Sequence, residues 1–306
     1  RIRAMKVTDN LQNDISHAPD WFHDSIAHPF EYKTVISDNH KVAYQAWGNK
    51  DQQNIIFLVH GTGAHMKWWN PIAPQFSDEA YVLALDLPGM GDSAHKNEYS
   101  FAAFSQAIMD ILNEEELINN NKNIILVGHS LGGHVAGFAA SEHPEIIDYL
   151  VMIDTPIRPP DYDYAKHRST GPLRMIKYYE NKESIINRFR LMPAQECEND
   201  WYLRYIGEHS IYENEEGWRW KFDDTLFWKL GRLSEYKFNI QCKALYIYGG
   251  NSMLLGSKIL NFMAKEFEEI MDFVEVPGAA HHVPLDKPLE IVAIIKSKIS
   301  EWEIKK

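Results

Sequence analysis

Short, almost continuous apolar runs recur along the first half of the chain, and each one ends in glycine or a polar residue. Four such runs lie at residues 54–61, 81–89, 123–130 and 149–156. This pattern is typical of parallel strands that are buried on both faces of a sheet. Between them, residues 100–115 and 131–144 carry apolar side chains three to four positions apart, which predicts amphipathic helices. The alternation predicts an α/β fold in which helices cover a mostly parallel sheet.

The same alternation begins with two β-rich segments and returns near the C-terminus. Residues 31–37 and 41–48 flank Asp38-Asn39, which predicts an antiparallel hairpin. An apolar run at residues 243–250 later resumes the pattern of the central strands. We expect a helix, a strand and a final helix to follow it, at residues 257–267, 271–278 and 289–302.

The pattern is interrupted between residues 157 and 236, and the interruption predicts an inserted domain. We expect a core made of residues 1–156, with an N-terminal extension at residues 1–30, and of residues 237–306, with a helical cap at residues 157–236. The cap is rich in aromatic residues, among them Tyr178, Tyr179, Trp201, Tyr202, Trp218, Trp220 and Trp228. These side chains either line a substrate pocket or only pack the cap onto the core. Because the core loops at the strand ends supply chemistry, we expect the cap to set substrate choice.

Charge and cysteine content narrow the range of partners and compartments. The formal net charge of −12 opposes binding to nucleic acid or to an anionic membrane surface. The first residues lack the apolar segment of a signal peptide, and no stretch approaches the roughly 18 apolar residues that span a bilayer. Cys197 and Cys242 are too few and too far apart for a disulfide framework or a metal cluster, which fits inert thiols in a reducing compartment. We expect a cytoplasmic monomer or homodimer that needs neither a metal nor another cofactor.

A candidate nucleophile lies within residues 128–132, which read Gly-His-Ser-Leu-Gly. This Gly-x-Ser-x-Gly motif stands between a predicted strand and a predicted helix, which is the context that a nucleophile elbow requires. The serine of such an elbow sits on a tight, strained turn, and glycines flank it because larger side chains would collide with the strand or the helix. The turn exposes the Ser130 hydroxyl at a helix N-terminus, where free N–H groups and the helix dipole stabilise developing negative charge.

With two further landmarks, the chain resembles the α/β-hydrolase family. His-Gly-Thr at residues 60–62 follows the third predicted strand, and Asp-Leu-Pro-Gly-Met-Gly-Asp-Ser at residues 86–93 follows the fourth. The resemblance covers about residues 31–304 and implies an eight-stranded, mostly parallel sheet with flanking helices and a helical cap after strand six. It also implies an oxyanion hole formed by the backbone N–H groups of Thr62 and Leu131. Donors beside the nucleophile and directly after it are those that can reach a tetrahedral oxyanion.

The chain has 14 histidines, so position must select the base. His281 follows the last predicted strand and precedes the closing helix, a spacing that matches the catalytic-histidine loop of the family. Its neighbour His282 is the alternative. His60 and His129 lie beside the oxyanion loop and within the elbow, where similar positions of the family pack or hydrogen-bond locally, so we interpret both as structural.

The acid of the expected triad departs from the usual family pattern. Most members carry Asp or Glu just after strand seven, but residues 249–257 contain no carboxylate. Ser252 stands at the expected place. The next acidic residue, Glu266, falls too far into the following helix to orient a histidine at the strand ends.

Asp154 is the candidate acid, because it closes the strand before the cap at the sheet edge where ligands bind. Some family members take their acid from this place, and residues 152–156 resemble the motif of the serine hydrolase-like proteins. We therefore predict a triad of Ser130, His281 and Asp154, in which the carboxylate orients the imidazole and stabilises its cation. The alternative is that Asp154 only caps its strand while Ser252 assists a weaker Ser–His pair.

A serine nucleophile implies an acyl-enzyme, so we expect a small-molecule carboxylic ester of small or medium acyl length as substrate. Haloalkane dehalogenases and epoxide hydrolases share the fold but attack with a carboxylate, which Ser130 excludes. One alternative is a carbon–carbon bond hydrolase of ring-cleavage products, which cap cations such as Arg188, Arg190 or Arg204 would favour by binding a substrate carboxylate. Another is a small-ligand sensor on the same fold, against which the intact Ser130 and His281 count.

Overall fold

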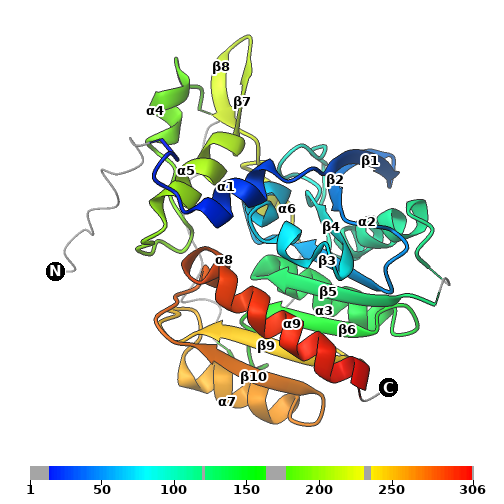
Figure 1. Ribbon diagram of the computed structural model, residues 1–306. Coiled ribbons are helices and arrows are strands. Elements are labelled where there is room, and N and C mark those ends of the chain that lie inside the picture. Colours follow the sequence, from blue (N-terminus) through cyan, green and yellow to red (C-terminus); the bar gives the residue numbers. More distant parts are fainter. Residues whose placement is uncertain (1–13, 119–120, 163–176, 231–235, 305–306) are drawn as a thin grey trace.

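A twisted eight-stranded sheet forms the centre of the computed structural model, which describes residues 14–118, 121–162, 177–230 and 236–304 (Figure 1). The strands lie in the order β1-β2-β4-β3-β5-β6-β9-β10. Their bounds are Glu31–Ser37 (β1), His40–Trp47 (β2), Asn54–Val59 (β3), Ala80–Leu85 (β4), Asn123–His129 (β5), Tyr149–Ile153 (β6), Lys243–Gly249 (β9) and Met271–Val276 (β10). The pairs β1–β2 and β2–β4 are antiparallel, and the other neighbours in the sheet are parallel. The predicted mostly parallel eight-stranded sheet is confirmed.

The central strands are buried on both faces, as their unbroken apolar runs predict. Every residue of β4 and β5 is buried. One face is covered by α2 (Phe101–Glu114), α3 (Leu131–Glu142) and α7 (Ser257–Glu266). The other is covered by η2 (Met66–Trp69), η3 (Ala73–Phe76), α8 (Val283–Asp286) and α9 (Pro288–Ile304). Within the described ranges, no helix combines the length and the apolar character needed to cross a membrane.

The antiparallel edge of the sheet begins with the predicted hairpin. Ser37 pairs with His40, which leaves only Asp38 and Asn39 in the turn between β1 and β2. Both turn residues have a positive φ, 46° and 60°, as a type I′ turn requires. Asp and Asn tolerate this left-handed conformation better than most residues, so the sequence-based prediction of the hairpin is confirmed.

Between β6 and β9 the chain leaves the sheet and forms the segment expected to be a helical cap. Its described elements are α4 (Lys182–Ile186), α5 (Asp200–His209), β7 (Ile211–Asn214), β8 (Gly217–Trp220) and α6 (Leu226–Lys229). The antiparallel hairpin of β7 and β8 adds a two-stranded sheet to the expected helices, because its Ile, Tyr and Trp residues favour extended backbone. Parts of the expected cap (163–176 and 231–235), part of the N-terminal extension (1–13) and the Trp228 side chain lie outside the described residues.

Aromatic residues of α5 pack the cap against the N-terminal helix α1 (Asp20–Ala27) and against the core. The ring of Phe22 in α1 lies 4.5 Å from that of Trp201 and 5.5 Å from that of Tyr202, measured between centroids. The Tyr202 hydroxyl donates a hydrogen bond of 2.6 Å to the Trp68 carbonyl oxygen in η2. These four side chains are buried, so Trp201 and Tyr202 hold the cap to the core, which is one of the two roles expected for the aromatic residues.

Gly132, in the first turn of α3, allows this helix to lie against the end of β3. A Cβ at this position would lie 2.2 Å from the Val59 carbonyl oxygen and 2.5 Å from that of His60. We expect Gly132→Ala to destabilise the fold by about 1–3 kcal/mol, the usual effect of overpacking. Gly256→Ala is the matched control, because a Cβ there meets no atom within 4 Å and φ is −71°. Urea unfolding measures both variants, and equal midpoints would contradict the close contact of α3 with β3.

Candidate active site

Ser130 lies on the turn that joins β5 to α3, at the carboxyl end of the parallel strands. Its φ of 54° and ψ of −117° are strained for any residue with a side chain. Glycine is required two positions earlier, since a Cβ on Gly128 would lie 2.2 Å from the Gly132 carbonyl oxygen. The Ser130 N–H donates to the Ile153 carbonyl oxygen at 2.9 Å, which ties the strained turn to the end of β6. The turn therefore has the geometry of the elbow that the motif predicted.

His281 and Asp154 form a continuous hydrogen-bonded chain with Ser130. His281 Nε2 is 3.0 Å from Ser130 Oγ, and His281 Nδ1 is 2.7 Å from Asp154 Oδ1. A carboxylate accepts hydrogen bonds, so Nδ1 carries the imidazole proton and Nε2 is left to accept the hydroxyl proton of Ser130. His281 comes from the loop after β10, and Asp154 comes directly after β6. The structure thus brings together the three residues that the sequence pattern assigned to one site.

Asp154 is fully buried and accepts hydrogen bonds on both carboxylate oxygens. Besides the His281 imidazole, Oδ1 accepts from the Ser252 hydroxyl at 2.7 Å, and Oδ2 accepts from the Gly249 N–H at 2.9 Å. A buried carboxylate needs such donors, because burial alone strongly disfavours its charge. Ser252 therefore acts on Asp154, whereas the alternative from sequence had it assist the Ser–His pair. Glu266 lies at the far end of α7, as expected.

The loop after β3 lies directly against the elbow. A Cβ on Gly61 would be 3.3 Å from Ser130 Cβ and 3.1 Å from His129 Nδ1, which is closer than side chains usually pack. The backbone N–H groups of Thr62 in this loop and of Leu131 at the start of α3 donate to no acceptor among the residues that the structure describes. Both groups are therefore available to an oxygen atom from outside the chain.

Two buried histidines hold the loops around the elbow. His60 Nδ1 donates to the Gly61 carbonyl oxygen at 2.7 Å, and its Nε2 accepts from the Leu87 N–H at 3.0 Å. Burial lowers the pKa of His60 to about 4, so this imidazole is neutral near pH 7. His129 Nε2 donates to the His281 carbonyl oxygen at 2.9 Å, and burial holds the pKa of His129 well below its usual value. Both side chains have the structural surroundings that their positions in the sequence predict.

His282, the alternative base, is packed among rings. Its ring centroid lies 5.7 Å from that of Trp68 and 5.4 Å from that of His129, and burial lowers the pKa of His282 to about 3. Nitrogen atoms of His129, His281 and His282 lie within 4.8 Å of one another, a spacing that could suggest a metal site. The group does not suit a metal ion, because both ring nitrogens of His281 already hold the hydrogen bonds described above.

A glutamine of the cap clamps the loop that carries His281. Gln195 Oε1 accepts from the His282 N–H at 2.9 Å, and Gln195 Nε2 donates to the two carboxylate oxygens of Asp286 at 3.0 and 2.9 Å. Asp286 Oδ2 in turn accepts from the Ala280 N–H at 2.8 Å. Ala280 and His282, on either side of His281, are therefore held by the Asp286 carboxylate and the Gln195 amide. The sequence contains no signal for this clamp, since a single glutamine outside a periodic element forms no pattern.

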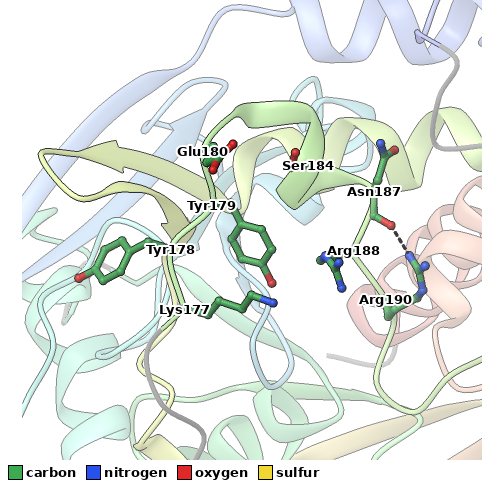
Figure 2. A pocket seen from close by; sticks show the side chains of 8 residues that line it. All are labelled: Lys177, Tyr178, Tyr179, Glu180, Ser184, Asn187, Arg188 and Arg190. Atoms are coloured by element: carbon green, nitrogen blue, oxygen red, sulfur yellow. Dashed lines mark hydrogen bonds between the residues drawn. The ribbon is translucent and has the colours of Figure 1, made fainter.

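The cap arginines considered from sequence have different surroundings. Arg204 is buried and pairs with Glu183 at 2.8 Å and with Glu208 at 2.7 Å, so the cap itself neutralises its charge. Arg188 and Arg190 are exposed and line an open cavity of about 530 Å³ (Figure 2). Neither of these two has an ion pair with a described residue, so within the described part of the chain both can meet a ligand without first breaking one.

The two cysteines are free thiols. Burial raises the pKa of Cys197 and of Cys242 to about 12. A thiol with a raised pKa is a poor nucleophile, because the thiolate is the reactive form. Their surroundings match the inert thiols expected from sequence.

Comparison with known proteins places the chain in a family. The model of the α/β hydrolase fold matches residues 54–288. The chain belongs to the α/β-hydrolase fold family. Similar proteins include a serine hydrolase-like protein of Danio rerio, 24% identical over 272 residues (82% of each chain), and a putative esterase/lipase of Haemophilus influenzae, 23% identical over 246 residues (79% of this chain and 82% of the relative).

Among solved structures, E-2-(acetamidomethylene)succinate hydrolase resembles this α/β hydrolase with a TM-score of 0.73 and 20% identity. The match covers 89% of this chain and all of the other, 100%, and at this identity it shows the shared fold. Family and relatives together support a hydrolase.

The Gln195 clamp can be tested without an activity assay. We expect Gln195→Ala to speed amide hydrogen exchange in residues 278–283 severalfold, because one hydrogen bond contributes about 0.5–1.5 kcal/mol net. Glu196→Ala is the matched control, since Glu196 is the exposed next residue of the chain. Exchange is followed by mass spectrometry of the corresponding peptides. Equal exchange rates in the two variants would show that Gln195 does not hold the His281 loop.

Proposed function

We propose that this α/β hydrolase is a serine hydrolase that cleaves carboxylic esters through an acyl-enzyme. The observation that carries the proposal is the unbroken hydrogen-bonded chain from Ser130 through His281 to Asp154. Ser130 Oγ attacks the carbonyl carbon of the ester while His281 Nε2 takes the hydroxyl proton. Asp154 holds the imidazole in the required tautomer and stabilises the cation that forms.

The attack turns the carbonyl oxygen into an oxyanion, which the N–H groups of Thr62 and Leu131 bind in this mechanism. Leu131 begins α3, so the positive end of the helix dipole adds to the stabilisation. His281 then gives its proton to the leaving alcohol, and the acyl group stays on Ser130. A water molecule attacks the acyl-enzyme, passes a proton to His281, and the acid leaves as Ser130 regains its hydrogen.

Ester hydrolysis is favoured over the two alternatives considered from sequence. The relative from Haemophilus influenzae is called a putative esterase/lipase, which supports an ester substrate here. A carbon–carbon bond hydrolase would use the same three residues and stays the second candidate. Arg204 is already paired within the cap, but Arg188 and Arg190 line a cavity where they could bind a substrate carboxylate. A sensor would need neither a strained serine nor a buried acid beside the histidine, so their presence counts against that function.

The first test of this function is turnover of simple chromogenic esters. We expect the purified protein to hydrolyse p-nitrophenyl acetate and p-nitrophenyl butyrate, and Ser130→Ala to lower kcat by about 10⁴-fold or more. The Ser130 side chain belongs to neither apolar core, so the variant should unfold at an unchanged urea concentration. A folded Ser130→Ala protein with undiminished turnover would rule out the serine mechanism.

The choice of acid is tested by two substitutions on the same carboxylate network. We expect Asp154→Asn to lower kcat by about 10³- to 10⁴-fold, because the amide no longer fixes the tautomer or balances the imidazolium charge. Ser252→Ala should lower kcat by less than about tenfold, because Asp154 keeps its bonds to His281 and Gly249. Steady-state kinetics on p-nitrophenyl butyrate gives both values. A larger loss of kcat in Ser252→Ala than in Asp154→Asn would contradict Asp154 as the acid and place the residue that orients His281 in the loop after β9.

A further inference from the structure

A second group of functional side chains surrounds the open cavity of about 530 Å³ in the cap. Lys177, Arg188 and Arg190 line it together with Tyr179. Figure 2 shows the side chains of Lys177, Tyr179 and Arg188 pointing toward one another from two separate stretches of the cap. Three positive charges therefore gather around one opening.

These positive charges have no acidic partner among the residues that the structure describes. Lys177 and Arg188 form no ion pair or hydrogen bond with a described side chain, and Arg190 donates to the carbonyl oxygens of Asn187 and Phe189, at 2.9 and 2.6 Å. Like charges held close together repel one another unless a counter-ion lies between them. The arrangement favours an anion in the cavity.

The rest of the chain makes this excess of positive charge unusual. Acidic residues outnumber Lys and Arg by 43 to 31, and in the same cap Arg204 has two carboxylate partners. Among the described residues that line the cavity, Glu180 supplies one carboxylate against three cations. The local charge is thus opposite in sign to that of the whole protein, which concentrates small anions at this place.

Tyr179 holds the cations in place. The Lys177 Nζ lies 5.1 Å and the Arg188 Cζ 5.9 Å from the centroid of its ring, within the range of cation–π attraction. The Tyr179 backbone is itself fixed to Trp218 in β8 by two hydrogen bonds of 2.9 and 2.8 Å. Two cations are therefore positioned before a ligand arrives, which reduces the entropy lost on binding.

The cavity is joined to the Ser130 site by a short stretch of chain. Met192 is two residues from Arg190, and its Cε lies 3.8 Å from the point that a Cβ on Gly63 would occupy, beside Thr62. The Cα atoms of Arg190 and Met192 are at most about 7 Å apart, so three consecutive residues connect the cavity to the loop after β3. An extended substrate that lies on Ser130 and follows this stretch of chain would bring its far end toward the cavity.

We propose that the cavity binds an anionic group of the substrate. The proposal rests on the ester hydrolysis proposed above and narrows its substrate to esters or thioesters that carry a carboxylate or a phosphate away from the reacting carbonyl. Arginine suits both groups, because its planar guanidinium donates two parallel hydrogen bonds to their oxygens. Lys177 adds a point charge, and Ser130 acts on the carbonyl at the other end of the molecule.

Matched substrates test the anion site. p-Nitrophenyl butyrate is neutral, mono-p-nitrophenyl glutarate carries a carboxylate, and butyryl-coenzyme A carries phosphates. We expect kcat/KM to be higher for at least one anionic substrate than for the neutral one. The double variant Lys177→Gln, Arg188→Gln should lower the ratio of these two kcat/KM values about tenfold or more. If the ratio for the glutarate ester falls more, the cavity binds a carboxylate. If the ratio for butyryl-coenzyme A falls more, it binds a phosphate. Arg188→Lys should keep only part of the ratio, because lysine keeps the charge but loses the two parallel hydrogen bonds. Lys237→Gln is the control, since Lys237 is 86% exposed and lies outside the cavity.

Binding to the inactive Ser130→Ala protein separates this proposal from the ester hydrolysis. Calorimetric titration with glutarate and with coenzyme A should show binding that the double substitution weakens about tenfold or more. If the wild type hydrolyses neutral esters while the double variant changes neither the ratio nor the binding, the anion site is refuted and the esterase stands. If no ester is hydrolysed but anion binding depends on Lys177 and Arg188, the esterase is refuted and the anion site stands.

Discussion

The side chain of Asp154 is fully buried, and the C-terminal ends of the parallel strands are arranged around it. A charge without exposure to water persists only where donors converge on it, and here they come from the His281 imidazole, the Ser252 hydroxyl and the Gly249 N–H. These donors lie in the loop after β10, in the loop after β9 and at the end of β9 itself. The ends of β6, β9 and β10 must therefore meet at one point, and this meeting places His281 beside the elbow.

The strained turn at Ser130 is held by the same kind of convergence. Its N–H is tied to Ile153, one residue before the buried carboxylate, and glycines allow β3, β5 and α3 to approach it closely. Gln195 of the cap accepts a hydrogen bond from the loop that carries His281. The cap and the loop that carries His281 are consequently linked by hydrogen bonds on both sides of His281.

Local patterns explain what could be predicted from the sequence. Short, almost continuous apolar runs predicted the sheet, and the Gly-x-Ser-x-Gly context predicted the strained turn, because both depend on neighbours in the chain. Asp154 could be chosen because residues 249–257 lack a carboxylate and a strand end offered one. The structure brings it to His281, but the role of the pair in catalysis stays a prediction.

Features that depend on distant contacts could not be predicted in the same way. The β7–β8 hairpin mixes aromatic and charged residues without a clean alternation. Gln195 acquires its partners only when the cap meets the loop after β10. The arginines of the cap looked alike in the sequence, and only the fold shows that Arg204 is paired while Arg188 faces an open cavity.

Covalent labelling is the most direct test of Ser130 as a nucleophile that His281 and Asp154 activate. A fluorophosphonate reacts with an activated serine and leaves a stable adduct, which intact-protein mass spectrometry and peptide mapping locate. We expect one adduct per chain, on Ser130, formed far more slowly when Asp154 is replaced by Asn. Hydrolysis of esters by a protein that takes no label at Ser130, or that is labelled at another residue, would contradict it.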